Sequence, residues 1–107
     1  MPCPYEHTTS YGQGTAKGPE ALLEASAQVE LFDEELWTET HSIGIASMPA
    51  INFAGKIGEA AVTLVAETVD KLFADKKFPV ILGGEHTLSS GCIMAAVKYF
   101  PNLTVVQ

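Results

Sequence analysis

The chain has 107 residues, enough for one domain or a part of one, and 47% of them are hydrophobic. Six Lys and Arg residues against thirteen Asp and Glu give a formal net charge of −7, which argues against nucleic acid or an anionic membrane as partner and favours a cationic small substrate. Two distant cysteines outside any C-x-x-C pair, and no apolar run near the ~20 residues that cross a bilayer, indicate a soluble cytoplasmic protein.

The start of the chain divides into a loop and a helix. Residues 2–18 are rich in proline and glycine and show no periodicity, which predicts a long loop, either functional or a disordered end. Pro19 suits the first turn of a helix, and the helix formers behind it predict a helix over residues 19–28. The acidic run at residues 33–35 is expected at the solvated surface.

The rest of the chain alternates between strand and helix. Residues 43–48 form an apolar strand candidate, and apolar residues at helical spacing predict an amphipathic helix over 55–73. A strand is expected at 79–82, a helix at 89–100 and a last strand at 103–106. Because the helix at 89–100 carries a single charge, we expect it to be packed on more than one side.

This alternation predicts an α/β fold, in which right-handed crossovers build a parallel sheet with helices on both faces. Parallel sheets usually have about five or more strands. Three predicted strands therefore favour the interpretation that the chain is one portion of a larger α/β domain.

The most informative residues follow the strand at 79–82. Gly83 and Gly84 form a turn that lets a short polar triplet project beyond the carboxyl end of the strand, where functional groups gather in α/β sheets. His86 lies at that point and is a candidate ligand for a transition metal. Glu85 and Thr87 are candidates to orient it from outside the metal's coordination sphere or to cap the next helix.

Residues 83–87, G-G-E-H-T, resemble the G-G-D-H-S signature of the ureohydrolases, the arginase and agmatinase family. Glu in place of Asp and Thr in place of Ser are mild departures. Residues 4–11, 14–21 and 24–26 resemble the agmatinase elements P-Y-D-x-T-x-S-Y, G-x-x-x-G-P-x-A and E-A-S in the same order. The resemblance covers nearly the whole chain.

The resemblance implies a three-layer α/β/α fold of the arginase and deacetylase type, with His86 as the first ligand of a two-manganese centre. The implied reaction is metal-assisted hydrolysis of a guanidinium group, and in the agmatinase branch agmatine and water give putrescine and urea, a step of polyamine biosynthesis. Guanidinobutyrase and arginase are alternatives within the family. The resemblance also implies a homo-oligomer, a trimer or a hexamer.

The family's later ligand motifs, D-x-H-x-D and D-x-D-x-x-D, do not occur in this sequence. Its only aspartates, Asp33, Asp70 and Asp75, are expected on a surface loop and on or just beyond the long helix. The chain is therefore interpreted as the N-terminal part of a single ureohydrolase domain, over residues 1–107, trimmed at both ends. On its own it is expected to contain no catalytic residue, to bind manganese weakly or not at all, and to be inactive.

Residues outside the G-G-E-H-T segment include a loop near its expected site and two residues expected in packing roles. His7, Thr8 and Thr9 lie in the loop that the family places near the mouth of the active site, although His7 also suits a plain exposed position. Cys92 is expected to be a small buried apolar residue, and Trp37 to serve packing. A short, non-catalytic α/β module for binding or assembly remains the alternative from a different functional class.

Overall fold

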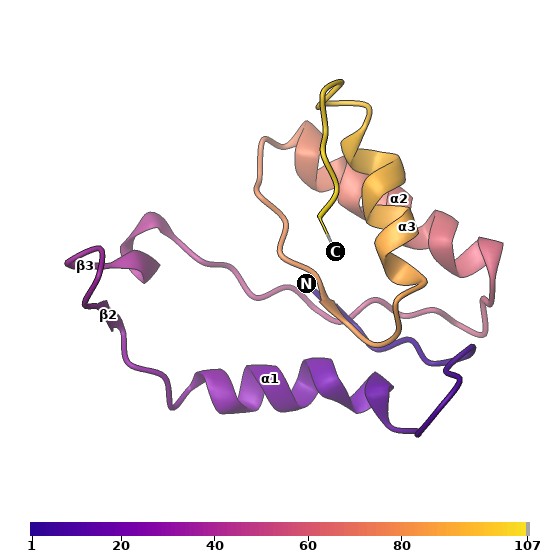
Figure 1. Cartoon of the computed structure of the whole chain (residues 1–107), viewed down its shortest axis with the longest axis horizontal. Helices are drawn as coiled ribbons and strands as arrows, with labels where there is room; N and C mark the ends of the chain where they lie inside the picture. Colours follow the sequence, from indigo (N-terminus) through magenta and orange to yellow (C-terminus); the bar gives the residue numbers. More distant parts are fainter. Residues whose placement is uncertain (107) are drawn as a thin grey trace.

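The computed structural model describes residues 1–106 and has the α/β architecture with a parallel sheet that the alternation predicts. Helix α1 lies on one side of the strands near the N-terminus, and helices α2 and α3 lie together on the other side (Figure 1). The elements in chain order are β1 (Pro2–Cys3), α1 (Gly18–Ser26), β2 (Phe32–Asp33), β3 (Thr38–Glu39), α2 (Glu59–Ala74), β4 (Leu82–Gly83) and α3 (Leu88–Ala96), with 3₁₀ turns at Thr15–Lys17 and Thr40–Ile43.

The parallel sheet joins the two ends of the sequence. Strand β1 pairs with β4, so that Pro2 lies opposite Leu82 and Cys3 opposite Gly83. On the other edge of β1, the Ile51 N–H donates to the Pro2 carbonyl at 2.9 Å. The prediction of a loop from residue 2 was therefore wrong at its start, because β1 obtains its hydrogen bonds from Ile51 and from the distant strand β4, which a local pattern does not contain.

The core forms where α2 crosses α3. Ala61, Val65 and Val69 recur every four residues on one face of α2, and they pack with Leu88 and Ala95 of α3. All three predicted helices are confirmed, with shifted ends. Helix α2 begins only at Glu59 because the positive φ angles at residues 54, 55 and 58 interrupt the backbone before it.

Both cysteines belong to this apolar region. Cys3 is fully buried, and burial raises the pKa of its thiol to about 11. Cys92 is half-buried against the core, and burial raises its thiol pKa as well. Protonated, enclosed thiols are poor nucleophiles, which agrees with the apolar interpretation of Cys92.

Two predicted strands are absent from the part of the chain that the structure describes. Residues 44–50 have no regular structure, and Ile45 is 73% exposed. Residues 103–106 are likewise irregular and exposed, and the strand expected at 79–82 is reduced to β4. A strand requires a hydrogen-bonded partner, and among residues 1–106 neither of these two apolar segments pairs with a strand.

The helix predicted at 89–100 also differs from expectation. Helix α3 ends at Ala96, and its buried residues are Leu88, Gly91 and Ala95. Met94 on its other side is half-exposed. Within residues 1–106, α2 is the helix that covers α3, and Ile93 and Ala96 line a hollow that they share with Pro79, Ile81 and Leu103.

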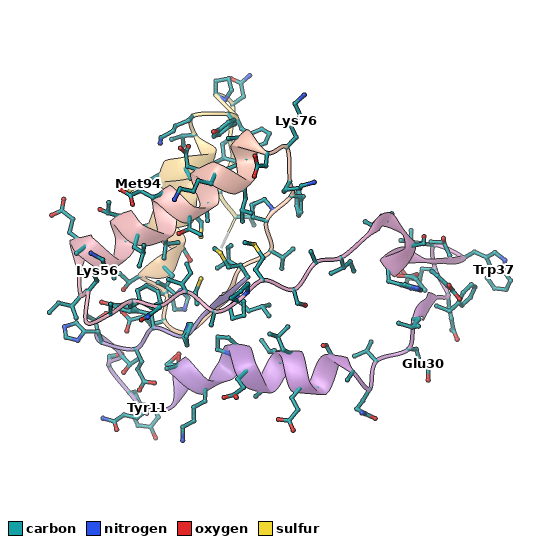
Figure 2. All side chains as sticks on the ribbon, turned by 180° about the vertical axis from the view of Figure 1, so that it is seen from behind. Tyr11, Glu30, Trp37, Lys56, Lys76 and Met94 are labelled. Carbon is teal, nitrogen blue, oxygen red and sulfur yellow. The ribbon has the colours of Figure 1, made fainter. Side chains whose placement is uncertain are left out.

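A small antiparallel hairpin formed by β2 and β3 was not predicted. Phe32 pairs with Glu39, and the acidic run forms the turn, where the Asp33 carboxylate accepts the N–H groups of Glu35 and Leu36. Trp37 projects from the hairpin at the far end of the molecule (Figure 2), is 79% exposed and packs edge-on against Phe32. No helix within residues 1–106 is long and apolar enough to cross a membrane.

The start of α1 depends on a carboxylate from the preceding loop. Glu6 accepts hydrogen bonds from the N–H of Gly14 at 2.9 Å and of Ala16 at 3.0 Å, where the 3₁₀ turn leads into α1. These bonds, first that of Ala16 and then that of Gly14, lower the pKa of Glu6. A negative charge here also complements the positive end of the helix dipole.

We expect Glu6→Gln to lower the melting temperature at neutral pH, because it removes the charge that these N–H groups bind. Since folding lowers the pKa of Glu6 below its ordinary value of 4.5, its contribution is present above that pH and is lost as the pH falls through the folded-state pKa. Thermal melts between pH 3 and 7 should therefore converge at the acidic end. Glu24→Gln, an exposed position later in α1, is the control, and a constant difference at every pH would contradict this role for Glu6.

Candidate metal-ligand site

The turn between β4 and α3 carries the candidate ligand. Strand β4 ends at Gly83, and His86 follows at the carboxyl end of the strand with an exposed side chain. Its carbonyl accepts the Ser89 N–H at 3.0 Å, which links the turn to the first residues of α3. The structure thus places one accessible imidazole at the edge of the sheet where ligands collect in α/β folds.

The second glycine of the turn permits a close approach of two backbone segments. A Cβ atom on Gly84 would overlap the carbonyl oxygen of Tyr5 and would lie 2.9 Å from its carbonyl carbon. That same oxygen accepts the Glu85 N–H at 3.1 Å, while the Gly84 N–H donates to the Cys3 carbonyl at 3.1 Å. Tyr5 is itself buried, and its hydroxyl accepts the Gly58 N–H at 2.9 Å. The turn is therefore fixed directly onto residues 3–5.

The Glu85 side chain ties the turn to the loop after Tyr5. Its Oε2 accepts the backbone N–H groups of His7 and Thr8, both at 2.7 Å, and its Oε1 accepts the Thr8 hydroxyl at 2.6 Å. Glu85 is the one buried charged residue in the part of the chain that the structure describes. A buried carboxylate is stable here because each oxygen receives a short hydrogen bond.

The hydrogen bonds also decide the charge of Glu85. Burial by itself raises the pKa of the carboxyl group, but the hydrogen bonds from the Thr8 hydroxyl, from the N–H groups of His7 and Thr8 and from Thr87 outweigh it and lower the pKa to about 2. The carboxylate is ionised at neutral pH, which means that it accepts these bonds as an anion.

Glu85 and Thr87 were also candidates to cap α3, and that prediction is wrong. Thr87 occupies the N-cap position, yet no side-chain hydrogen bond caps the helix. The Thr87 hydroxyl instead lies 3.2 Å from the Thr8 hydroxyl. Neither side chain caps the helix because both contact Thr8, in the loop on the opposite side of the turn.

The structure brings the two predicted groups of site residues together. Thr8 contacts Glu85 and Thr87 directly, His7 reaches Glu85 through its backbone N–H while its ring is exposed, and Thr9 follows half-buried. The contribution of Tyr5 was missed. Its place between Pro4 and Glu6 in the P-Y-E-H-T segment was the available signal, but nothing local indicates which distant residues that segment contacts.

The donors near the turn suit one metal ligand and not a complete site. Among residues 1–106, no group of three or more His, Cys, Asp or Glu side chains is placed to hold a metal ion. The carboxylates of Glu6 and Glu85 are occupied by loop N–H groups, whereas the His86 imidazole is exposed. Asp70 on α2 beside Lys98 and Asp75 directly after α2 lie where they were expected. Asp33 does not lie on a loop, because it ends strand β2 and its carboxylate accepts N–H groups of the hairpin turn.

Residues 1–107 match the family described as the Arginase family. The chain is 43% identical over 113 aligned residues to an N(1)-aminopropylagmatine ureohydrolase of Synechocystis, covering 100% of this chain and 37% of that protein. It is 30% identical over 95 residues to a protein of the same name from Thermus thermophilus, covering 89% and 32%. An agmatinase of Bacillus cereus is 29% identical over 104 residues, covering 97% and 36%. The chain spans about a third of the length of these relatives, and no solved structure matches it.

Proposed function

Since the chain belongs to the arginase family, we propose that it forms the N-terminal part of a single ureohydrolase domain, which in its complete form hydrolyses a cationic guanidino compound to urea and an amine. The observation that carries this proposal is the position of His86. Its imidazole is exposed at the carboxyl end of a parallel strand, in a turn fixed by a buried tyrosine and a buried carboxylate. At that position an imidazole can reach a metal ion while the backbone that carries it is held by the turn.

The proposed metal is manganese, and His86 is the ligand that these residues contribute. A relatively hard divalent cation prefers oxygen and nitrogen donors, so its carboxylate ligands would come from outside residues 1–106. When bound, two such ions would lower the pKa of a bound water, so that hydroxide would be available at neutral pH to attack the guanidinium carbon. The part played by this chain is to present the imidazole and to keep the turn rigid.

The proposed substrate is agmatine, which would yield putrescine and urea. N(1)-aminopropylagmatine is a second candidate, because the relative from Synechocystis that carries this activity in its name aligns with the whole chain. Both compounds have a guanidinium head and a cationic tail, and the net charge of −7 favours their approach. Arginase and guanidinobutyrase activities, and a non-catalytic assembly role, are outcomes that the same assay distinguishes.

The test uses the complete enzyme that contains these residues, prepared with manganese. Losing a group that only orients a metal ligand typically costs about 10- to 100-fold in metal affinity or activity. We expect His86→Ala, which removes the ligand itself, to lower manganese content and urea release by more than that. His41→Ala is the matched control, since it removes an exposed histidine near the β2–β3 hairpin. Agmatine, N(1)-aminopropylagmatine, arginine and guanidinobutyrate are compared as substrates.

Wild-type manganese content and activity in His86→Ala would remove His86 from the ligand set, and no urea from any of the four substrates would favour the non-catalytic alternative. The 107-residue chain produced alone is expected to bind manganese weakly or not at all and to release no urea. We also propose that the complete protein is a homo-oligomer, a trimer or a hexamer. The proposed location is the cytoplasm, because the free thiols of Cys3 and Cys92 suit a reducing compartment.

A further inference from the structure

The two residues that flank His86 reach the same partner. Glu85 accepts the Thr8 hydroxyl at 2.6 Å and the Thr8 N–H at 2.7 Å, and the Thr87 hydroxyl lies 3.2 Å from that of Thr8. Between them, His86 is exposed. The side chains of both neighbours of the candidate ligand thus contact one residue, Thr8, in a loop that is nearly eighty positions away in the sequence.

The loop that provides these anchors is itself held at both ends. Tyr5 precedes it, buried and bonded to the turn through its carbonyl, and Glu6 binds the N–H groups of Gly14 and Ala16 where the loop enters α1. Its tip remains free of the core, since Tyr11 is 98% exposed and projects outward (Figure 2). Residues 7 and 8 therefore offer Glu85 fixed donors.

From this arrangement we infer that Glu85 is a positioning residue: its carboxylate locks the His7–Thr8 segment onto the β4–α3 turn and so fixes the direction in which His86 presents its imidazole. The inference rests on the proposed role of His86 as a metal ligand. Groups that orient a metal ligand without touching the metal affect metal affinity, and their substitution typically weakens it by about 10- to 100-fold. Glu85 does so through the backbone, by fixing the turn, in place of a bond to the ring.

The chemistry of the contacts predicts how substitutions will rank. Glu85→Ala leaves two backbone N–H groups without their acceptor, which is more disruptive than the loss of one bond. Glu85→Gln keeps most of the arrangement, because one amide oxygen can accept both N–H groups while the amide NH₂ donates to the Thr8 hydroxyl. Thr8→Val removes the hydroxyl that Glu85 and Thr87 share and leaves the backbone N–H in place.

The experiment measures manganese affinity by equilibrium dialysis and urea release at increasing manganese, using the complete enzyme. We expect Glu85→Ala to weaken manganese binding by about 10- to 100-fold and Thr8→Val by about 10-fold, with a smaller loss for Glu85→Gln. At saturating manganese, kcat of the Glu85 variants should return close to the wild-type value, because both carboxylate oxygens of Glu85 are bonded to the His7–Thr8 segment and the proposed role involves no contact with the substrate. Glu67→Gln, an exposed carboxylate on α2, is the control.

The inference would be overturned if Glu85→Gln and Thr8→Val both bind manganese with wild-type affinity, and Glu85→Ala either does the same or fails to fold. A lower melting temperature without a change in manganese affinity would also overturn it, since that is the result of a purely structural role. The His86→Ala variant separates the two proposals. If it loses manganese while the Glu85 variants do not, only the positioning role fails, and if it keeps manganese, the proposed ligand itself is wrong.

Discussion

Gly84→Ala is expected to lower the free energy of unfolding by about 3 kcal/mol or more, at or above the upper end of the usual cost of forcing extra atoms into a packed site. The added Cβ would overlap the Tyr5 carbonyl oxygen and approach the Tyr5 carbon at 2.9 Å and nitrogen at 3.0 Å. All three are backbone atoms, so no side-chain rotation can relieve the contact. Chemical denaturation of the two proteins measures the difference.

The neighbouring glycine supplies the matched control. A Cβ on Gly83 would meet only the Leu88 Cδ1 atom at 3.8 Å, an ordinary van der Waals contact, and Gly83→Ala is therefore expected to change stability by less than about 0.5 kcal/mol. Equal effects of the two substitutions would show that the close approach of Tyr5 to the turn is not what requires glycine. Because Gly84→Ala displaces the turn, it should also weaken manganese binding in the complete enzyme, and Gly83→Ala should not.

The helices were predictable because their signals are local. The apolar residues of α2 recur every four positions, and Pro19 marks the first turn of α1. The exact residues at which the helices begin and end were harder to predict. The start of α2 at Glu59 depends on positive φ angles at Ala54, Gly55 and Gly58, which the sequence suggests only through its two glycines.

The strands were less predictable because a strand is defined by its partner. The apolar segment at 43–48 has the composition of a buried strand, yet it is exposed, whereas Pro2–Cys3 has no strand-like pattern and lies in the sheet. Pairing of β1 with β4 links residues about eighty positions apart, and no periodicity within either segment identifies the other.

The same contrast applies to the candidate site. The motif around His86 placed it correctly at a strand end, because a Gly-Gly turn after an apolar run is a local pattern. The network of Tyr5, Thr8 and Glu85 could not be read in that way. Glu85 and Thr8 were separate candidates, and their contact could not be predicted, because the hydrogen bonds that join them span 77 positions.

Gly91→Ala tests the second close contact of the fold, the crossing of α2 and α3. A Cβ on Gly91 would lie 2.6 Å from the Val62 carbonyl oxygen and 3.0 Å from the Val65 Cβ, which means that the two helices would have to separate. In an isolated helix the substitution would stabilise by about 1 kcal/mol, because alanine is the better helix former. Overpacking costs about 1–3 kcal/mol, and the contact with a backbone oxygen at 2.6 Å places this substitution in the upper part of that range, so we expect a net loss of about 1–2 kcal/mol.

The neighbouring residue separates helix propensity from packing at this crossing. Ser90 is exposed on α3, and Ser90→Ala therefore gains propensity without entering the α2–α3 contact. It should be neutral or slightly stabilising in thermal and denaturant unfolding, whereas Gly91→Ala should be destabilising. If Gly91→Ala instead stabilises the protein as Ser90→Ala does, the two helices lie farther apart than a glycine contact requires, and the core formed by Val65 and Ala95 is not what fixes their separation.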